Sequence, residues 1–266
     1  MHPVLFTFPE FLPLIGGYNI RVYGFLVALG FLLALIYVKK ESRRVGLNPD
    51  RTMDLFFYIA IFSIVGARVF YIINSVGADF FSDPLMIFRF WEGGLVFQGG
   101  IIGAIAVGIY YVRKHKMGVF KTGDVFAPGL ALGHAVGRIG CFFAGCCYGK
   151  QCDLDYPLRV VFPHDPLSVA PPGIAVYPTQ LFESLGEFAI FGFLLWYRRR
   201  KPFDGAMFLM YLMVYSVLRS ILEIYRGDQI RGFVVEPYLS NGQFLSVVTI
   251  IVCLFLWVYL KRGKAS

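Results

Sequence analysis

Charge is scarce in this sequence. Of its 266 residues, 16% are Asp, Glu, Lys or Arg, whereas soluble domains carry about 25%, so the composition argues against a soluble protein. The N-terminal segment before Gly17 lacks Lys and Arg and contains Pro3, Pro9 and Pro13, which is atypical of a secretory signal peptide. The five cysteines do not follow the paired C-x2-C spacing of common zinc sites. We also find no tandem repeat and no low-complexity tract.

Long apolar stretches are abundant instead. Hydrophobic residues make up 57% of the chain, and seven stretches approach or reach the roughly 20 residues that cross a bilayer as a helix. They cover residues 18–38, 54–74, 95–112, 124–143, 178–197, 205–225 and 243–260. Glycines loosen the fourth stretch, but small residues also allow membrane helices to approach closely. We therefore predict an all-α integral membrane protein with seven transmembrane helices in a single domain, residues 1–266.

Basic residues predict the orientation of these helices. Most of the 25 Lys and Arg residues fall in alternate connections and in the tail, at 39–51, 113–121, 198–201 and 261–264. The positive-inside rule makes that side cytoplasmic, which puts the N-terminus outside and the C-terminus inside. The net charge of +8 therefore reflects membrane topology. The four groups of basic residues are too dispersed along the chain to form a nucleic-acid-binding face.

Recognition elements are expected on the outer side. The longer connections 75–94, 144–177 and 226–242 lie there in this topology, whereas the cytoplasmic ones are short and basic. Residues 5–15 are read as a short outer arm with its aromatic side chains in the membrane interface.

The run from His134 to Gly149 contains the first candidate site. His134, Arg138 and Cys141 follow the spacing i, i+4 and i+7, which places them on one helix face. Charge at the bilayer centre costs about 2.5–3.5 kcal/mol, and the arginine fork suits phosphate, so a phospholipid is the simplest ligand. Amide groups freed between Gly145 and Gly149 could form an anion-binding nest. The alternative is that Arg138 only extends to the outer surface.

A second cluster follows the same spacing. Arg219, Glu223 and Arg226 end the sixth apolar stretch at i, i+4 and i+7. We expect one arginine to pair with Glu223 and the other to be available to substrate. The alternative is a self-contained salt bridge that docks helices, since charges inside membranes often pair with one another.

The fifth stretch also carries polar residues on one face. Gln180, Glu183 and Glu187 could hydrogen-bond the arginines or line a wet cavity, or they could serve helix packing alone. Four cysteines cluster between Cys141 and Cys152. On the outer side they could form disulfides, although packing as small buried residues is the simplest interpretation.

Several ordered motifs together resemble the bacterial prolipoprotein diacylglyceryl transferase family, nearly from end to end. The most specific piece is the glycine-rich segment 137–149, followed by Arg219-x3-Glu223-x2-Arg226. Further matches are Ile20-Arg21-Val22-Tyr23-Gly24, Trp91-x-Gly93-Gly94, Asp124, Tyr177-Pro178-Thr179-Gln180-Leu181-Phe182-Glu183 and Gly242-Gln243.

The resemblance implies transfer of the diacylglyceryl group of phosphatidylglycerol to the thiol of a lipobox cysteine, in a prolipoprotein that still has its signal peptide. A thioether forms and glycerol-1-phosphate leaves. It further implies a location in the bacterial inner membrane, with the site toward the outer side, and neither a metal nor an organic cofactor. Catalytic roles are expected for Arg138, Arg219, Glu223, His134 and Gln98. Lipid binding is expected for Arg138, Arg219, Tyr23, Arg226, Gly149, Cys141, Gln180 and Glu183.

The sequence departs from the family pattern at three positions. Gln98 stands where many members have a histidine and others a tyrosine, and glutamine cannot act as a base near neutral pH. Cys141 replaces an asparagine and Cys146 an acidic residue. We hypothesise that His134 partly fills the role of the base. Alternatively, two arginines lower the pKa of the incoming thiol, ordinarily about 8.5, without any base.

Two other function classes compete with the transferase. An anion transporter or channel could line its path with arginines, but the glycine-rich segments show no paired half-transporter repeat. A lipid-binding relative that has lost activity together with the histidine would share the same motifs. Detection of covalent lipid transfer separates the enzyme from both.

Overall fold

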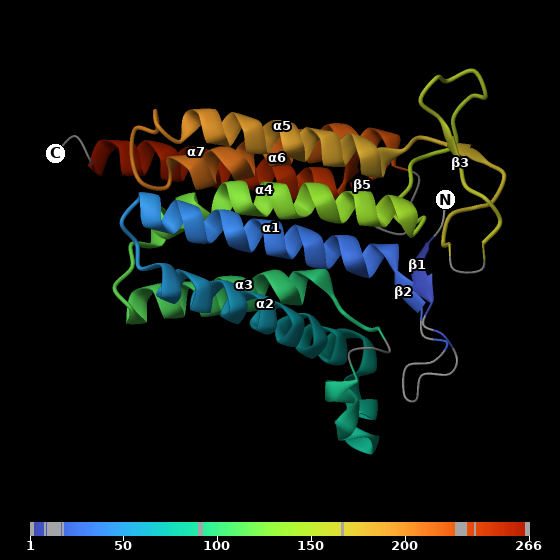
Figure 1. Cartoon of the computed structure of the whole chain (residues 1–266), viewed down its shortest axis with the longest axis horizontal. Helices are drawn as coiled ribbons and strands as arrows, with labels where there is room; N and C mark the ends of the chain where they lie inside the picture. Colours follow the sequence, from blue (N-terminus) through green and yellow to red (C-terminus); the bar gives the residue numbers. More distant parts are fainter. Residues whose placement is uncertain are drawn as a thin grey trace. The chain divides into compact units, whose positions relative to one another are not determined.

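The structure is a computed structural model that describes residues 3–7, 9, 17, 19–89, 93–165, 168–226, 233–236 and 238–263. Most of the predicted N-terminal arm and the pair Trp91-Glu92 lie outside the described residues. The chain is largely helical, as expected (Figure 1). Its long helices are α1 (Val22–Arg44), α2 (Pro49–Tyr71), α3 (Phe97–Lys114), α4 (Val119–Phe143), α5 (Thr179–Tyr197), α6 (Ala206–Tyr225) and α7 (Asn241–Gly263).

Short elements connect the helices. Three antiparallel two-stranded sheets pair β1 (Val4–Thr7) with β2 (Asn19–Arg21), β3 (Val160–Val161) with β4 (Ala175–Val176), and β5 (Phe233–Val235) with β6 (Leu239–Ser240). After α2 come a π-helical turn, η1 (Ile72–Val76), and two 3-10 turns, η2 (Gly77–Ser82) and η3 (Pro84–Phe88).

Boundaries of three predicted helices were wrong by four to six residues, and one of them is the start of α2, at Pro49 instead of the predicted 54. We expected the first helix at 18–38, but α1 begins at Val22 because the preceding residues pair as β2. It continues to Arg44, where Arg44 forms an ion pair with Glu41 at 2.5 Å within the last turns. The fourth helix begins at Val119, before the predicted 124, so that Asp124 lies inside α4.

Five helices are long and apolar enough to cross a membrane: α1, α2 together with η1, α4, α6 and α7, counted over the described residues. The other two are limited by polar residues. α3 has 18 residues and ends in Arg113 and Lys114, and α5 contains the buried Glu183 and Glu187. The protein is therefore a multi-pass membrane protein, and the count of seven spans stays a prediction.

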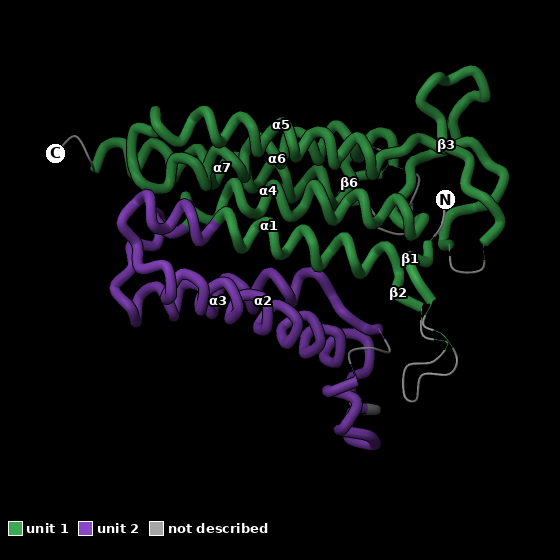
Figure 2. The backbone as a smooth tube through the Cα atoms, viewed as in Figure 1, with its two compact units in different colours: residues 1–37, 123–266 green, residues 38–122 purple. Residues whose placement is uncertain are grey.

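The chain forms two compact units, which are described separately (Figure 2). Unit 1 comprises residues 1–37 and 123–266, and unit 2 comprises residues 38–122. The predicted sites all fall in unit 1 except Gln98. The prediction of a single domain is not tested by this division.

In unit 1, α4, α5 and α6 run side by side (Figure 1). Ala127 and Ala131 of α4, Ile190 and Leu194 of α5, and Met207 of α6 belong to one buried apolar cluster. The small alanines allow close approach of α4, which suits a glycine- and alanine-rich membrane helix. Similarly, a Cβ on Gly30 of α1 would lie 2.8 Å from the carbonyl oxygen of Gly133, so the loosely apolar fourth stretch does form a packed helix.

Asp124 fixes the start of α6. Its carboxylate is buried and accepts hydrogen bonds from the main-chain N–H groups of Gly205 at 2.8 Å and Phe208 at 2.9 Å, and from the Lys201 ammonium at 2.8 Å. A carboxylate at a helix N-terminus satisfies free N–H groups and complements the helix dipole. This family-motif residue is thus a helix cap supplied by another helix.

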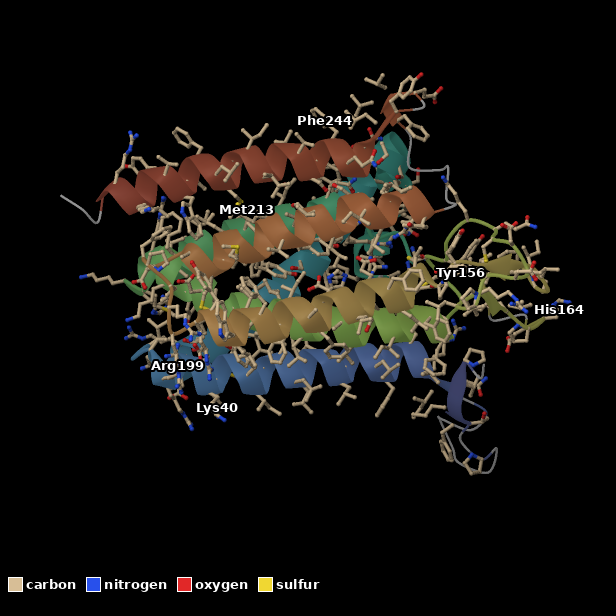
Figure 3. The ribbon with its side chains drawn as sticks, turned by 90° about the horizontal axis from the view of Figure 1, so that it is seen from above. Lys40, Tyr156, His164, Arg199, Met213 and Phe244 are labelled. Carbon is tan, nitrogen blue, oxygen red and sulfur yellow. The ribbon has the colours of Figure 1, made fainter. Side chains whose placement is uncertain are left out.

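The basic connection between α5 and α6 and the 144–177 region lie at opposite ends of unit 1. Figure 3 places Arg199, in the basic connection between α5 and α6, at one end of α5, and Tyr156 and His164, in the 144–177 region, at the other. The polar face of α5, which starts at Gln180, is at the Tyr156 end.

Unit 2 contains a buried arginine with a different environment. Arg68 of α2 donates through each of its three nitrogens to main-chain carbonyls in the segment that leads to α3: those of Met86, Arg89, Gly93 and Gly94. The Tyr71 ring lies 5.3 Å from its guanidinium carbon. Arg68 therefore fastens this connection to α2.

Candidate functional site

Polar side chains from three helices of unit 1 meet in an otherwise apolar bundle. α4 contributes His134 and Arg138, α5 contributes Glu183 and Glu187, and α6 contributes Tyr215. Each set follows helical spacing, so each helix presents a polar stripe on one face. The stripes converge on Glu183, whose side chain is only 2% exposed.

Arg138 is held by a carboxylate. Its Nη2 donates to Glu183 Oε1 at 2.8 Å, and its side chain is 14% exposed. Tyr215 donates to the same oxygen at 3.2 Å. The charge of Arg138 is therefore neutralised inside the bundle, which contradicts the alternative that it merely extends to the outer surface.

His134 is engaged on both ring nitrogens. Nδ1 lies 2.6 Å from Glu187 Oε1, and Nε2 accepts from Arg138 Nε at 3.2 Å. With Nε2 as acceptor, the ring proton is on Nδ1, facing the carboxylate. His134 thereby orients Arg138, and it can take a proton from another molecule only after the contact with Arg138 breaks.

Arg219 forms the predicted pair with Glu223. Arg219 Nη2 forms an ion pair with Glu223 Oε2 at 2.6 Å, and the two side chains are 12% and 10% exposed. Within the described part of the chain, Arg219 Nη1 is buried without a hydrogen-bond partner. Arg219 also interacts electrostatically with Arg226 and Glu183. A buried N–H donor without a partner costs about 1–3 kcal/mol, so this group is poised to bind an acceptor.

The loop after α4 is fastened to α5. Gln180 Nε2 donates to the Cys146 carbonyl at 2.8 Å, and Thr179 Oγ1 donates to the Cys147 carbonyl at 2.9 Å. Gln180, predicted to bind lipid, is fully buried and uses its amide nitrogen on this loop instead. Its role in the described structure is to position the loop.

Gly149 lies where three segments meet. Its N–H donates to the Tyr177 carbonyl at 2.9 Å, and it forms a β-bridge with Arg226. A Cβ at this position would lie 2.7 Å from the carbonyl oxygens of Tyr177 and Tyr225, which only glycine avoids. This close approach brings the second arginine motif to the end of the first.

Three amide groups of the predicted nest already have hydrogen-bond partners within the chain. The N–H groups of Gly145, Cys146 and Gly149 donate to the carbonyls of Phe142, Cys141 and Tyr177, respectively. These donors are therefore not available to an anion, and the guanidinium groups are the better candidates.

Tyr23 reaches the same region from the start of α1. Its main chain and ring are close enough to contact a Cβ on Gly140. Its hydroxyl interacts electrostatically with Arg138 and with the thiols of Cys141, Cys146 and Cys147. Tyr23 is 44% exposed, so it flanks the polar cluster at its edge.

Three thiols gather beside Arg138. The Sγ atoms of Cys141, Cys146 and Cys147 all lie within 4.8 Å of one another, and all five cysteines of the chain are free thiols. Hydrogen bonds with Cys141 and Cys146 lower the pKa of the Cys147 thiol, and the charges of Arg138 and Arg226 act in the same direction against burial, which raises it. The disulfides that we considered as an alternative are not formed among these cysteines, and the paired C-x2-C spacing did not reveal this cluster.

One predicted site residue lies outside the cluster, and one residue of the cluster was not predicted. Gln98, at the start of α3, is exposed within unit 2 and is described only there. Conversely, Tyr215 belongs to the cluster but was not predicted, and Glu187, predicted only as part of the polar face of α5, contacts His134. The signal for Tyr215 was its position four residues before Arg219, which extends the polar stripe of α6 by one turn.

Comparison with known proteins identifies the family of this chain. The family model for prolipoprotein diacylglyceryl transferase matches residues 9–259. The chain belongs to the prolipoprotein diacylglyceryl transferase family.

Named relatives of the family match over nearly the whole length. A phosphatidylglycerol–prolipoprotein diacylglyceryl transferase of Clostridium tetani (strain Massachusetts / E88) is 38% identical over 97% of both chains. A second protein of that name, from Clostridium perfringens (strain 13 / Type A), is 38% identical over 91% of this chain and 92% of its own. One from Acinetobacter baumannii (strain SDF) is 30% identical over 98% of this chain and 96% of its own. The resemblance inferred from the ordered motifs is thereby confirmed.

Proposed function

We propose that this member of the prolipoprotein diacylglyceryl transferase family transfers the diacylglyceryl group of phosphatidylglycerol to the lipobox cysteine of prolipoproteins. The names of its relatives state both substrates. The sulfur of the acceptor attacks C3 of the lipid glycerol and forms a C–S bond. The C–O bond to phosphate breaks, glycerol-1-phosphate leaves with the bonding electrons, and the thiol proton passes to a base or to water.

The observation that supports this most is the pair of buried arginines held by carboxylates. Arg138 is positioned by Glu183 and His134, and Arg219 lies against Glu223 with its Nη1 available. The leaving phosphate gains negative charge as the C–O bond breaks. Preorganised guanidinium groups stabilise that charge in the transition state without reorganising.

The remaining predicted site residues take supporting roles in this proposal. Glu223 orients Arg219, Arg226 adds positive charge, and Gln180 and Gly149 hold the loop that joins the two arginine motifs. Tyr23 and Cys141 flank the lipid headgroup. A role for Gln98, which lies in unit 2, rests on the family pattern alone.

Seven helices cross the membrane in the proposed topology, with the N-terminus outside and the site toward the outer side of the bacterial inner membrane. α3 and α5 are included because their polar residues are at their ends or are buried with partners, as Glu183 and Glu187 are. The four groups of basic residues then lie on the cytoplasmic side. The whole chain acts as one membrane domain.

Reconstitution tests the function directly. Purified protein in phosphatidylglycerol liposomes is given a lipobox peptide, and mass spectrometry follows the diacylglyceryl adduct. We expect adduct from the unchanged protein and almost none from Arg138→Ala or Arg219→Ala. Arg159→Ala, in the exposed part of the outer region, is the matched control and should transfer normally.

Two results would contradict the proposal. Folded protein that binds phosphatidylglycerol but yields no adduct would favour transport or lipid binding. Adduct that persists in both arginine variants would show that Arg138 and Arg219 are not needed to stabilise the leaving phosphate. For the base, His134→Gln with an unchanged rate and pH profile would exclude proton transfer by His134 and leave the arginines to favour the thiolate.

A further inference from the structure

The cluster of Cys141, Cys146 and Cys147 has the geometry of an incomplete metal site. Each sulfur lies within 4.8 Å of the other two. Zinc holds cysteine sulfur at about 2.3 Å in a tetrahedral arrangement, which places ligand sulfurs about 3.8 Å apart. The three thiols are thus near enough to share one ion through side-chain adjustment alone. Cys152 and Cys253 are buried elsewhere and do not belong to this group.

The loop that carries two of these cysteines is held in an unusual conformation. Cys147 has φ of +60°, a left-handed backbone that is uncommon for residues other than glycine. Such conformations persist where the surroundings impose them, and they concentrate at functional sites. Here Thr179 and Gln180 of α5 bind the carbonyls of Cys147 and Cys146. These contacts hold the loop whose thiols lie next to Cys141, near the end of α4.

The charges around the cluster suit an anionic metal centre. Three thiolates with a divalent cation carry a net charge of −1. Arg138 and Arg226 both interact electrostatically with Cys147, so their guanidinium groups balance that charge. All three cysteines are partly exposed, which leaves the centre open to a further ligand.

In contrast to the family resemblance, which implies no metal, we propose that Cys141, Cys146 and Cys147 bind a thiophilic divalent cation of the zinc class, and that its fourth position takes the thiol of the acceptor peptide. Three protein ligands with an open fourth position are the pattern of catalytic rather than structural zinc sites. This inference rests on the proposed function for the identity of the fourth ligand. The three-sulfur site itself does not depend on it.

The metal centre replaces a protein base in thiol activation. A thiol that coordinates the ion is deprotonated outright, and its proton passes to water. The bound sulfur then attacks glycerol C3, the C–O bond breaks, and glycerol-1-phosphate leaves beside Arg138. The product is a neutral thioether, which the cation holds less strongly than a thiolate, so the fourth position is vacated. His134 needs no change of partners in this route, since both its ring nitrogens stay engaged.

Metal uptake is tested first, without any activity assay. The reduced full-length protein in detergent is stripped with a chelator and loaded with Zn²⁺ or Co²⁺, and bound metal is quantified. We expect a single ion per chain and, with Co²⁺, the sulfur-to-metal charge-transfer absorption of a tetrahedral thiolate site. Cys141→Ser, Cys146→Ser and Cys147→Ser should lose that absorption, whereas Cys253→Ser and Cys152→Ser should keep it.

A second readout guards against misfolded variants. In the unchanged protein, Zn²⁺ should protect these three cysteines from alkylation, as peptide mass spectrometry would detect. No metal uptake, or equal uptake by the triple serine variant, would overturn the site. A disulfide between two of these sulfurs, combined with no metal uptake after reduction, would also overturn the site.

The acceptor is tested with two peptides. A lipobox peptide should change the visible spectrum of the Co²⁺ protein, and the same peptide with serine in place of cysteine should not. At pH 7 about 3% of a thiol with a pKa of about 8.5 is ionised. Stripping the metal should therefore lower the transfer rate by up to about thirtyfold, and Zn²⁺ should restore it.

The outcomes separate the two proposals. Equal transfer by stripped and loaded protein would overturn metal activation while the transferase stands. A cysteine-specific spectral change without any lipid adduct would support the metal site while the proposed function fails. An identical response to both peptides would overturn the fourth-ligand role.

Discussion

Arg138 in unit 1 and Arg68 in unit 2 are both arginines within apolar helices, but their partners differ. Arg68 is bound on all three nitrogens by main-chain carbonyls, which are neutral and do not ionise. Arg138 is bound by the side chains of Glu183 and His134, which can shift when a ligand arrives. An arginine in a membrane helix is therefore not in itself a sign of a ligand site. The type of its partner distinguishes a structural fastening from a site that can accept phosphate.

The largest effect on the transfer rate is expected from a substitution of Arg138. Arg138→Lys keeps a positive charge beside Glu183 but removes the fork that binds two phosphate oxygens. We expect transfer to fall roughly a thousandfold, with the thermal unfolding temperature nearly unchanged. Initial rates of adduct formation and unfolding in detergent check both parts. A lysine variant with near-normal rates would show that charge alone suffices.

Arg68 should show the opposite pattern. Arg68→Met leaves several carbonyls of the η3–α3 connection without their donor, and we expect a loss of roughly 3 kcal/mol of stability. Denaturant unfolding of the purified protein measures this, and the exposed Arg159→Met is the control. An unchanged midpoint would mean that the fastening of the connection to α2 contributes nothing.

Glu183 accepts hydrogen bonds from both Arg138 and Tyr215. Glu183→Gln keeps the size of the side chain but removes the charge that positions Arg138 and accepts from Tyr215. We expect a decrease in transfer rate of roughly thirtyfold, about 2 kcal/mol, with phosphatidylglycerol binding less affected. If binding and rate fell equally, Glu183 would act in the ground state rather than in the transition state.

The smallest effect is expected at the opposite end of unit 1. Burial alone would lower the pKa of Lys201, but hydrogen bonds to Asp124 and Asp204 outweigh it and raise the pKa above its ordinary value. A raised lysine pKa stabilises the fold below the unfolded-state value of about 10.4, and this stabilisation is lost as pH rises through the folded-state pKa. Lys201→Met should therefore cost less than about 1 kcal/mol near neutral pH.

Unfolding of both proteins across alkaline pH tests the sign. The difference between unchanged protein and Lys201→Met should shrink as pH rises beyond the ordinary lysine pKa. A difference that grows with pH would contradict the assignment. Transfer should be normal in this variant, because Lys201 is far along the chain and at the other end of α5 from Gln180.

Helix positions and the arginine motifs were predictable because both follow local rules. A run of about 20 apolar residues marks a helix whatever its neighbours, and spacings of four and seven place His134, Arg138 and Cys141 on one face. Helix ends were less predictable. α1 begins where β2 ends and α4 begins before Asp124, and both depend on partners elsewhere in the chain.

Partners across helices were only partly predictable. Spacing indicated that Glu183 could face an arginine, but not that it would be Arg138, nor that Gln180 would hold the Cys146 carbonyl. The pairing of α4 with α5 depends on which small residues allow close approach. That is a property of two surfaces together, and neither stretch specifies it alone.

The sequence by itself determined the class of protein, its helices and the residues on each polar stripe, since hydrophobic length and helical periodicity are local properties. It also contained the motifs that identify the family. Only the tertiary structure decided that Arg138 has side-chain partners whereas Arg68 has main-chain partners. It also decided that the thiols of Cys141, Cys146 and Cys147 lie close together. The reason is physical: a left-handed turn at Cys147 and two hydrogen bonds from α5 fold the loop back on α4, and such a return is set by contacts between distant residues.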